Sequence, residues 1–201
     1  MIDEFNIDET IDLTKLMEIV DARETKVFTV EDYVATKEKL GFEELKHMSV
    51  RFYGSHEYDN FVCDFIEDIC KLKHDEKFEL IKSLYCTAKK SETLADILQG
   101  LVKTGGVPEK ERENIRKNYK PIVYRGYNEL NNKNGYSYTT DFEMAKWFAN
   151  RFRCFGKKGY VTKIDVDIDD IVFYYDGRGE KEMFIKESSL SEKIMEIIDI
   201  D

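Results

Sequence analysis

Apolar side chains recur every three to four residues through the first half of the chain, which is the spacing of one face of an α-helix. The clearest case runs from residue 57 to residue 72, where phenylalanine, isoleucine and leucine share one helical face. Thr29 before residues 30–40 and Ser91 before the next apolar run are typical helix N-caps. The pattern therefore predicts helices at residues 10–22, 30–40, 42–48, 57–72, 76–88 and from 91 onward.

Beyond Pro121 the pattern changes to short runs of β-branched and aromatic residues, which favour strands. One helix begins at Pro108 ahead of this change, and another is expected at residues 142–151 with Asp141 as its N-cap. In that second helix the side chains expected to face inward are Met144, Ala145, Trp147 and Phe148. Strands are expected at residues 122–127, 136–139, 160–166, 171–175 and 183–185, and the tail after Ser188 forms a short helix or a strand.

This order of elements, helices first and strands afterwards, indicates an α+β fold. We expect a helical region at residues 1–107 and a core built on a mixed β-sheet at residues 108–201. No apolar run approaches the roughly 18 residues that span a bilayer, and the N-terminus lacks the basic and apolar pattern of a secretory leader. These features, with four cysteines that show no C-x-x-C pair, predict a cytoplasmic protein without a membrane partner.

The net charge of −10 is concentrated at the start of the chain. Residues 1–70 carry 18 Asp and Glu against 7 Lys and Arg, whereas the rest of the chain carries 23 against 24. Because an acidic surface repels nucleic acid, a protein or a small molecule is the expected partner. Residues 146–164 contain six Lys or Arg and no acidic residue, which suits an anionic ligand or forms an ordinary basic loop. The three histidines lack ligand spacing, so no metal is expected.

Three polar motifs lie within residues 121–185, each attached to an expected strand. The first strand leads into Arg125 and Gly126, a charge beside a glycine. The second alternates hydroxyl and tyrosine side chains, so the period of a strand places Ser137 and Thr139 together on one face. These are candidate site residues because each stands where a strand ends or turns.

The third motif follows the flexible turn at residues 177–179 and contains Glu180 and Glu182. Strand alternation places Glu182 on the face opposite Met183 and Ile185. Two acids beside a turn are, by themselves, an ordinary solvent-facing feature. The pair becomes informative because the arginine and hydroxyl motifs precede it in the chain.

Taken in order, Tyr-Arg-Gly, then Ser-x-Thr-Thr-Asp with Ala-Lys-Trp-Phe-Ala, then Glu-x-Glu before an apolar strand, resemble the arginine-serine-glutamate class of mono-ADP-ribosyltransferases, of the bacterial or tailed-phage type. The resemblance implies an ADP-ribosyltransferase-like catalytic core that uses NAD as its substrate, releases nicotinamide and needs no metal. The middle motif departs from the family, which often has Ser-Thr-Ser where this chain has Ser-Tyr-Thr. Ser137 and Thr139 therefore both remain candidates for the family's serine.

The resemblance also implies a role for each candidate residue. Glu182 stabilises the positive charge that develops on the ribose as the bond to nicotinamide breaks. Ser137 orients Glu182, while Arg125 donates hydrogen bonds to the diphosphate or to the nicotinamide-side ribose. The residues implied to contact NAD are Arg125, Gly126, Ser137, Thr139, Arg151, Arg153 and Phe155.

Glu180 is implied to orient and deprotonate the acceptor, because Glu-x-Glu accompanies arginine acceptors in this family. The expected partner is then a target protein, such as a host protein, with an exposed arginine. Tyr174 or Tyr175 resembles the aromatic that relatives present to the target. Two alternatives remain open: an NAD glycohydrolase, in which water replaces the acceptor, and a non-catalytic acidic binding module that retains a degenerate transferase fold.

Overall fold

The computed structural model describes residues 29–37, 39–88, 91–128, 134–151, 158–193 and 195–200. The chain divides into two compact units, Met1–Leu40 and Gly41–Asp201. In the first unit, Thr29 caps helix α2 (Val30–Ala35), as the sequence predicts, and forms a capping box with Asp32. The helix ends at Ala35, earlier than residue 40. The helix expected at residues 10–22 lies outside the described residues.

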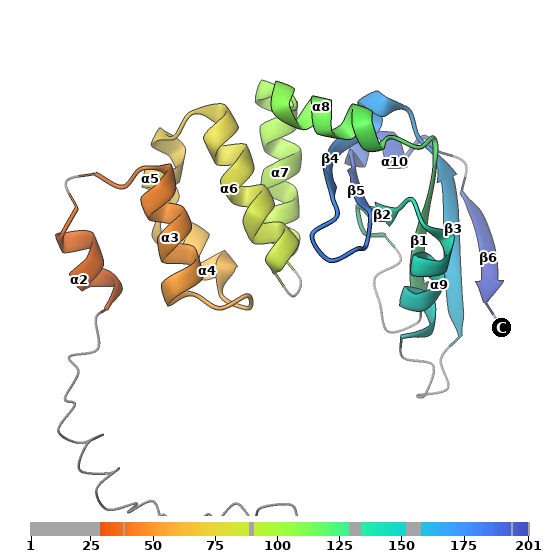
Figure 1. The fold of residues 1–201 in the computed structure, drawn as a ribbon, viewed down its shortest axis with the longest axis horizontal. Coiled ribbons are helices and arrows are strands. Elements are labelled where there is room, and N and C mark those ends of the chain that lie inside the picture. The colour runs from red at the N-terminus through yellow and green to blue at the C-terminus, as the bar shows by residue number, and fades with distance from the viewer. Residues whose placement is uncertain are drawn as a thin grey trace, which may run out of the picture. The chain divides into compact units, whose positions relative to one another are not determined.

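The second unit begins with six helices (Figure 1). Residues 57–72 form two helices rather than one, because the backbone at Phe65 leaves helical geometry (φ −116°, ψ 20°). The Phe65 ring packs against Phe61 and Tyr53 in an aromatic cluster. Gly41, which resembles a helix stop in the sequence, is instead the N-cap of the next helix. The helices are α3 (Phe42–Phe52), α4 (Tyr58–Asp64), α5 (Ile66–Lys71), α6 (His74–Thr87), α7 (Glu92–Gly105) and α8 (Glu109–Asn118).

The rest of the described part of the second unit contains a six-stranded sheet, with the order β4-β5-β2-β1-β3-β6, and two more α-helices. All its strand pairings are antiparallel, so the expectation of a mixed sheet was wrong, whereas the α+β class is confirmed. The tail forms both a short helix and a strand, which is the outer strand of the sheet. The elements are β1 (Ile122–Asn128), β2 (Ser137–Thr139), α9 (Phe142–Asn150), β3 (Gly159–Asp165), β4 (Ile171–Tyr175), β5 (Glu182–Ile185), α10 (Glu187–Leu190) and β6 (Glu196–Ile200).

The two faces of the sheet are covered by different helices. On one face Tyr138, Met183 and Ile185 join Ile115 of α8 in a buried core. On the other face the stacked rings of Phe173 and Phe184 pack against the ring of Tyr85 on α6. Helix α9 covers a neighbouring part of the sheet, where Ala145 and Ala149 pack against Val161 of β3.

Helix α9 approaches β1 closely because Gly126 has no side chain. A Cβ atom at residue 126 would lie 1.8 Å from the backbone oxygen of Ala145. Ala145 and Ala149 face the sheet, and at 100° per residue this places Trp147 on the far side of the helix. Trp147 is 55% exposed, so the expectation that it faces inward was wrong.

A buried ion pair attaches the helices to the sheet. Lys82 of α6 binds Glu111 of α8, whose side chain is only 7% exposed. The second carboxylate oxygen of Glu111 accepts a hydrogen bond from the backbone N–H of Tyr174 on β4 at 3.0 Å. Gln99 of α7 donates to the backbone oxygen of Ile185 at 3.0 Å. The boundary expected at residues 107/108 falls inside this unit and stays a prediction.

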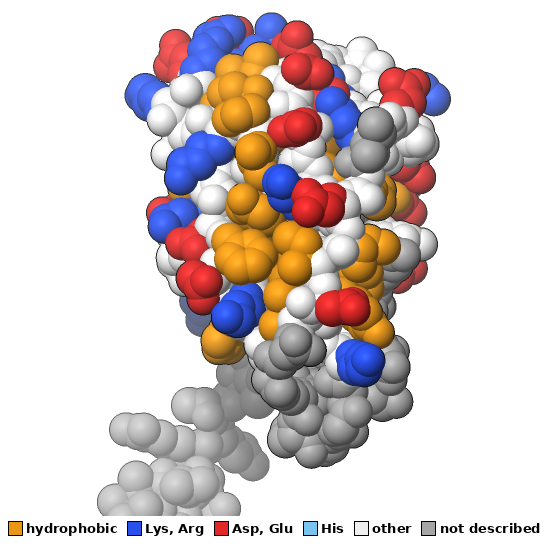
Figure 2. Space-filling model, turned by 90° about the vertical axis from the view of Figure 1, so that its right-hand side faces the viewer, with side chains coloured by type: hydrophobic (Ala, Val, Ile, Leu, Met, Phe, Trp, Pro, Cys, Tyr) orange, Lys and Arg blue, Asp and Glu red, His pale blue; other side chains and the backbone are white. Residues whose placement is uncertain are grey.

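The outer strand β6 and the residue before it carry exposed apolar side chains. Ile197 on this strand is 49% exposed, and Met195 before it is 42% exposed. Figure 2 shows hydrophobic side chains among charged ones on this side of the molecule. Within the described parts of the chain, none of the helices combines the length and the apolar character that crossing a membrane requires.

Candidate functional site

A cavity of about 620 Å³ lies between helices α6 and α7 and the sheet. This volume is within the range of small-molecule and cofactor sites, about 300–1,000 Å³. Arg153 and Phe155 lie outside the described residues. All the other predicted site residues line this cavity: Arg125, Gly126, Ser137, Thr139, Arg151, Glu180 and Glu182.

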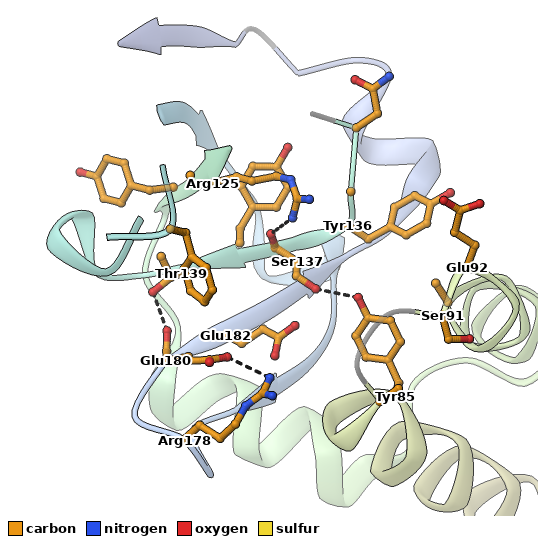
Figure 3. A pocket seen from close by; sticks show the side chains of 18 of the residues that line it. Tyr85, Ser91, Glu92, Arg125, Tyr136, Ser137, Thr139, Arg178, Glu180 and Glu182 are labelled. Atoms are coloured by element: carbon orange, nitrogen blue, oxygen red, sulfur yellow. Dashed lines mark hydrogen bonds and ion pairs between the residues drawn. The ribbon is translucent and has the colours of Figure 1, made fainter. Parts of the chain in front are cut away.

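Glu182 is the buried carboxylate of the cavity. It stands on β5 opposite Thr139 of β2, and the residue is only 8% exposed. Burial raises the pKa of Glu182 above its ordinary value of 4.5, because a charged carboxylate loses hydration there. A hydrogen bond from Ser137 and the positive charge of Arg178 act in the opposite direction. Figure 3 shows Glu182 directed into the same space as Ser137 and Arg178.

Tyr85 of α6 reaches the cavity from the helical part of the unit. Its hydroxyl lies 2.8 Å from the Ser137 hydroxyl (Figure 3). Burial, with the nearby charge of Glu182, raises the pKa of Tyr85 to about 12, so its hydroxyl keeps its proton at neutral pH. The sequence identifies Tyr85 only as part of the apolar side of a helix. No local pattern distinguishes it, because its partner lies 52 residues further along the chain.

The two candidate hydroxyls, of Ser137 and Thr139, have different hydrogen-bond partners in the structure. The Thr139 hydroxyl donates to the backbone oxygen of Glu180 at 2.6 Å and accepts from the backbone N–H of Asp141 at 3.1 Å. It therefore braces the start of α9 and the segment before β5. The Ser137 hydroxyl instead contacts side chains of the cavity, so Ser137 is in the better position to orient Glu182.

The side chain of Arg125 extends from β1 toward β2 and contacts the backbone of that strand. Its Nη1 donates to the backbone oxygen of Ser137 at 2.7 Å. The guanidinium lies against Gly135, where an added Cβ would come within 2.2 Å of Nη2. Burial lowers the pKa of Arg125, while Tyr138, Tyr85 and Glu182 raise it. The group remains a cation beside the cavity, suited to a diphosphate or another anion.

Glu180 carries an ion pair with Arg178 on the turn between β4 and β5. The Nη2 atom of Arg178 lies 3.0 Å from the Glu180 carboxylate, and the two side chains are 50% and 21% exposed. In the sequence, Arg178 is only the middle residue of a flexible turn. Lys181 between the two glutamates has a positive φ of 49°, a strained conformation for a residue other than glycine. Its backbone N–H binds Asp176 at 3.1 Å, which holds this conformation.

Of Arg151, Tyr174 and Tyr175, for which the sequence also predicts roles, only Arg151 is among the residues that line the cavity. Arg151 lines the cavity, and its guanidinium lies 5.6 Å from the ring centre of Trp147. Tyr175 pairs with Glu182 across the β4–β5 ladder, and Tyr174 is tied to Glu111 through its backbone. Helix α7 provides the opposite wall, with Ser91 and other residues near its start.

A buried carboxylate, a neighbouring hydroxyl and a guanidinium are groups chemically suited to stabilising a positive centre and to binding an anion. Among the described residues, no group of three or more His, Cys, Asp and Glu side chains could hold a metal ion. Comparisons with protein-family models, with curated proteins and with solved structures give no match for this chain.

Proposed function

We propose that this protein is an NAD-dependent mono-ADP-ribosyltransferase that transfers ADP-ribose to a protein arginine and releases nicotinamide. One observation carries the proposal: Arg125, Ser137, Glu180 and Glu182, from three separate motifs, line one cavity. The α+β architecture is compatible with the fold class that the motifs imply.

In the proposed mechanism, Glu182 faces the nicotinamide-side ribose. As the bond between C1′ and nicotinamide breaks, its electron pair leaves with nicotinamide and positive charge develops on the sugar. A carboxylate held with little hydration stabilises that charge more strongly than water does. Ser137, held by Tyr85, orients Glu182, and Arg125 binds the anionic part of NAD.

The acceptor enters beside Glu180, which is less buried than Glu182. A guanidinium nitrogen attacks C1′ and gives its proton to Glu180, so the carboxylate both orients and deprotonates the acceptor. The carboxylates of Glu92 and Asp96 line the cavity together with Glu180, and carboxylates suit a basic target segment.

The test is incubation of the full chain with NAD labelled in its adenylate part, together with agmatine, a small guanidino acceptor. We expect nicotinamide release and labelled agmatine, and loss of both in Glu182→Gln. Glu196→Gln, which changes an exposed carboxylate on β6, is the matched control and retains the activity. Wild-type turnover by Glu182→Gln would refute the proposed role of that residue.

The same experiment distinguishes the alternatives. Free ADP-ribose as the sole labelled product would indicate an NAD glycohydrolase. Absence of NAD binding in a calorimetric titration would favour the non-catalytic binding module.

A further inference from the structure

The residue bound to Glu180 is itself an arginine. Arg178 places its guanidinium 3.0 Å from the carboxylate that the proposed function assigns to the acceptor (Figure 3). Its positive charge also reaches Glu182, where it opposes the rise in the pKa that burial causes. A guanidinium of this chain therefore stands beside both carboxylates of the site, where an acceptor guanidinium would stand.

The turn that carries Arg178 has open space beside it. Gly179 has a φ of +71°, and an added Cβ there would have nothing within 4 Å. The Arg178 side chain is half exposed, and an exposed ion pair contributes little binding energy, about 0–1 kcal/mol. Arg178 can thus leave Glu180 when a target arginine enters, or reach toward the ribose when none is present.

We propose that Arg178 is an ADP-ribose acceptor in cis, so that the protein modifies its own Arg178, an inference that rests on the proposed function. The bond between ribose C1′ and nicotinamide breaks, and its electron pair leaves with nicotinamide. An Nη nitrogen of Arg178 forms the new bond to C1′, and the proton of that nitrogen passes to Glu180. While it is unmodified, Arg178 competes with the target arginine for Glu180.

The test uses the purified full chain with adenylate-labelled NAD, in the presence or absence of agmatine. Peptide mass spectrometry with fragmentation that preserves the adduct locates the ADP-ribose. We expect the adduct on Arg178. The fraction of the protein modified per unit time should not depend on protein concentration, because the acceptor is in the same chain.

Arg178→Lys keeps the charge and removes the guanidinium. We expect this variant to lose self-labelling and to label agmatine with a KM close to the wild-type value, because the lysine keeps the positive charge beside Glu180. Arg116→Lys is the matched control. Arg116 is also about half exposed (55%), and it lies 2.8 Å from Glu109, away from the cavity. Its variant is expected to label itself like the wild type.

Labelled agmatine with an unmodified Arg178 would overturn this inference and leave the proposed function standing. A raised KM for NAD in Arg178→Lys, without an adduct at residue 178 in the wild type, would assign the side chain to the dinucleotide and also overturn it. Absence of both nicotinamide release and label in every sample would reject the proposed function, and the inference with it.

Discussion

The hydroxyl of Tyr85 on α6 lies 2.8 Å from the hydroxyl of Ser137 on β2, and this contact links the helical part of the unit to the cavity. The ring of Tyr85 packs against Phe184 and Phe173 of the sheet, so the hydroxyl is held in place by aromatic contacts. Ser137 in turn lowers the cost of charging Glu182. The helix therefore holds the hydroxyl that favours the charged form of the buried carboxylate.

Tyr85→Phe removes this hydroxyl and keeps the ring. We expect nicotinamide release to fall about tenfold, the equivalent of one hydrogen bond, because Ser137 loses its fixed orientation. Steady-state measurement of kcat checks this, and circular dichroism verifies the fold. Tyr160→Phe is a control, since Tyr160 stacks on Tyr127 and does not line the cavity. Equal kcat values for wild type and Tyr85→Phe would contradict the positioning role.

The activity is expected to depend on the ionisation of Glu182. Because burial raises the pKa of Glu182 above 4.5, the charged form becomes abundant only at higher pH than for an exposed glutamate. The rate of nicotinamide release should therefore rise with pH through that raised pKa. Glu182→Gln should lower the rate about a hundredfold or more and abolish this limb of the profile. A wild-type rate that is independent of pH down to 4 would contradict this assignment.

The same carboxylate should reduce the stability of the fold at neutral pH. The folded pKa of Glu182 is above the unfolded value, so the folded state holds the proton more tightly. Its contribution to stability is fully present below about pH 4.5 and is lost as the pH rises through the folded pKa. Glutamine carries no charge, so Glu182→Gln should unfold at a higher urea concentration than the wild type at pH 7. The difference should disappear near pH 4, and a variant less stable at pH 7 would disprove this account.

Gly126→Ala should destabilise the protein because its Cβ would collide with the backbone of α9 at Ala145. We expect a loss of about 3 kcal/mol in the free energy of unfolding, as for severe overpacking. Gly100→Ala provides the contrast, since a Cβ at this exposed position in α7 has nothing within 4 Å. That variant should gain about 0.5–1 kcal/mol from helix propensity. Urea unfolding of both variants measures the change in the free energy of unfolding, which should be a loss for Gly126→Ala and a gain for Gly100→Ala.

Lys82→Met should leave the Glu111 carboxylate buried without its cation. We expect a loss of about 3 kcal/mol in the free energy of unfolding, and partial recovery in the double variant with Glu111→Gln, which removes the charge and keeps an acceptor for Tyr174. The control is Lys163→Met at an exposed pair with Glu196, where the loss should stay below about 1 kcal/mol. Similar losses at the two pairs would show that burial is not the cause.

Local signals in the sequence predict most elements, but they do not show where tertiary contacts break a helix or which of its faces becomes buried. The caps at Thr29, Ser91 and Asp141 start helices where expected, because a capping side chain binds backbone groups of its own helix. The break at Phe65 was missed because helical spacing continues through it. The inward placement of Trp147 was wrong because Gly126, distant in the chain, determines which face of α9 meets the sheet.

Alternation along single strands predicted that Ser137 and Thr139 share a face and that Glu182 lies opposite Met183 and Ile185, because the period of a strand is a local property. The sequence by itself thus determined most of the elements and the α+β class, and it identified candidate site residues. Only the tertiary structure decided that every strand pairing is antiparallel, that Tyr85 holds Ser137, that Thr139 braces the backbone, and that Arg178 lies against Glu180. Those relationships join residues through space, and no spacing along the chain encodes which side chains of different elements come into contact.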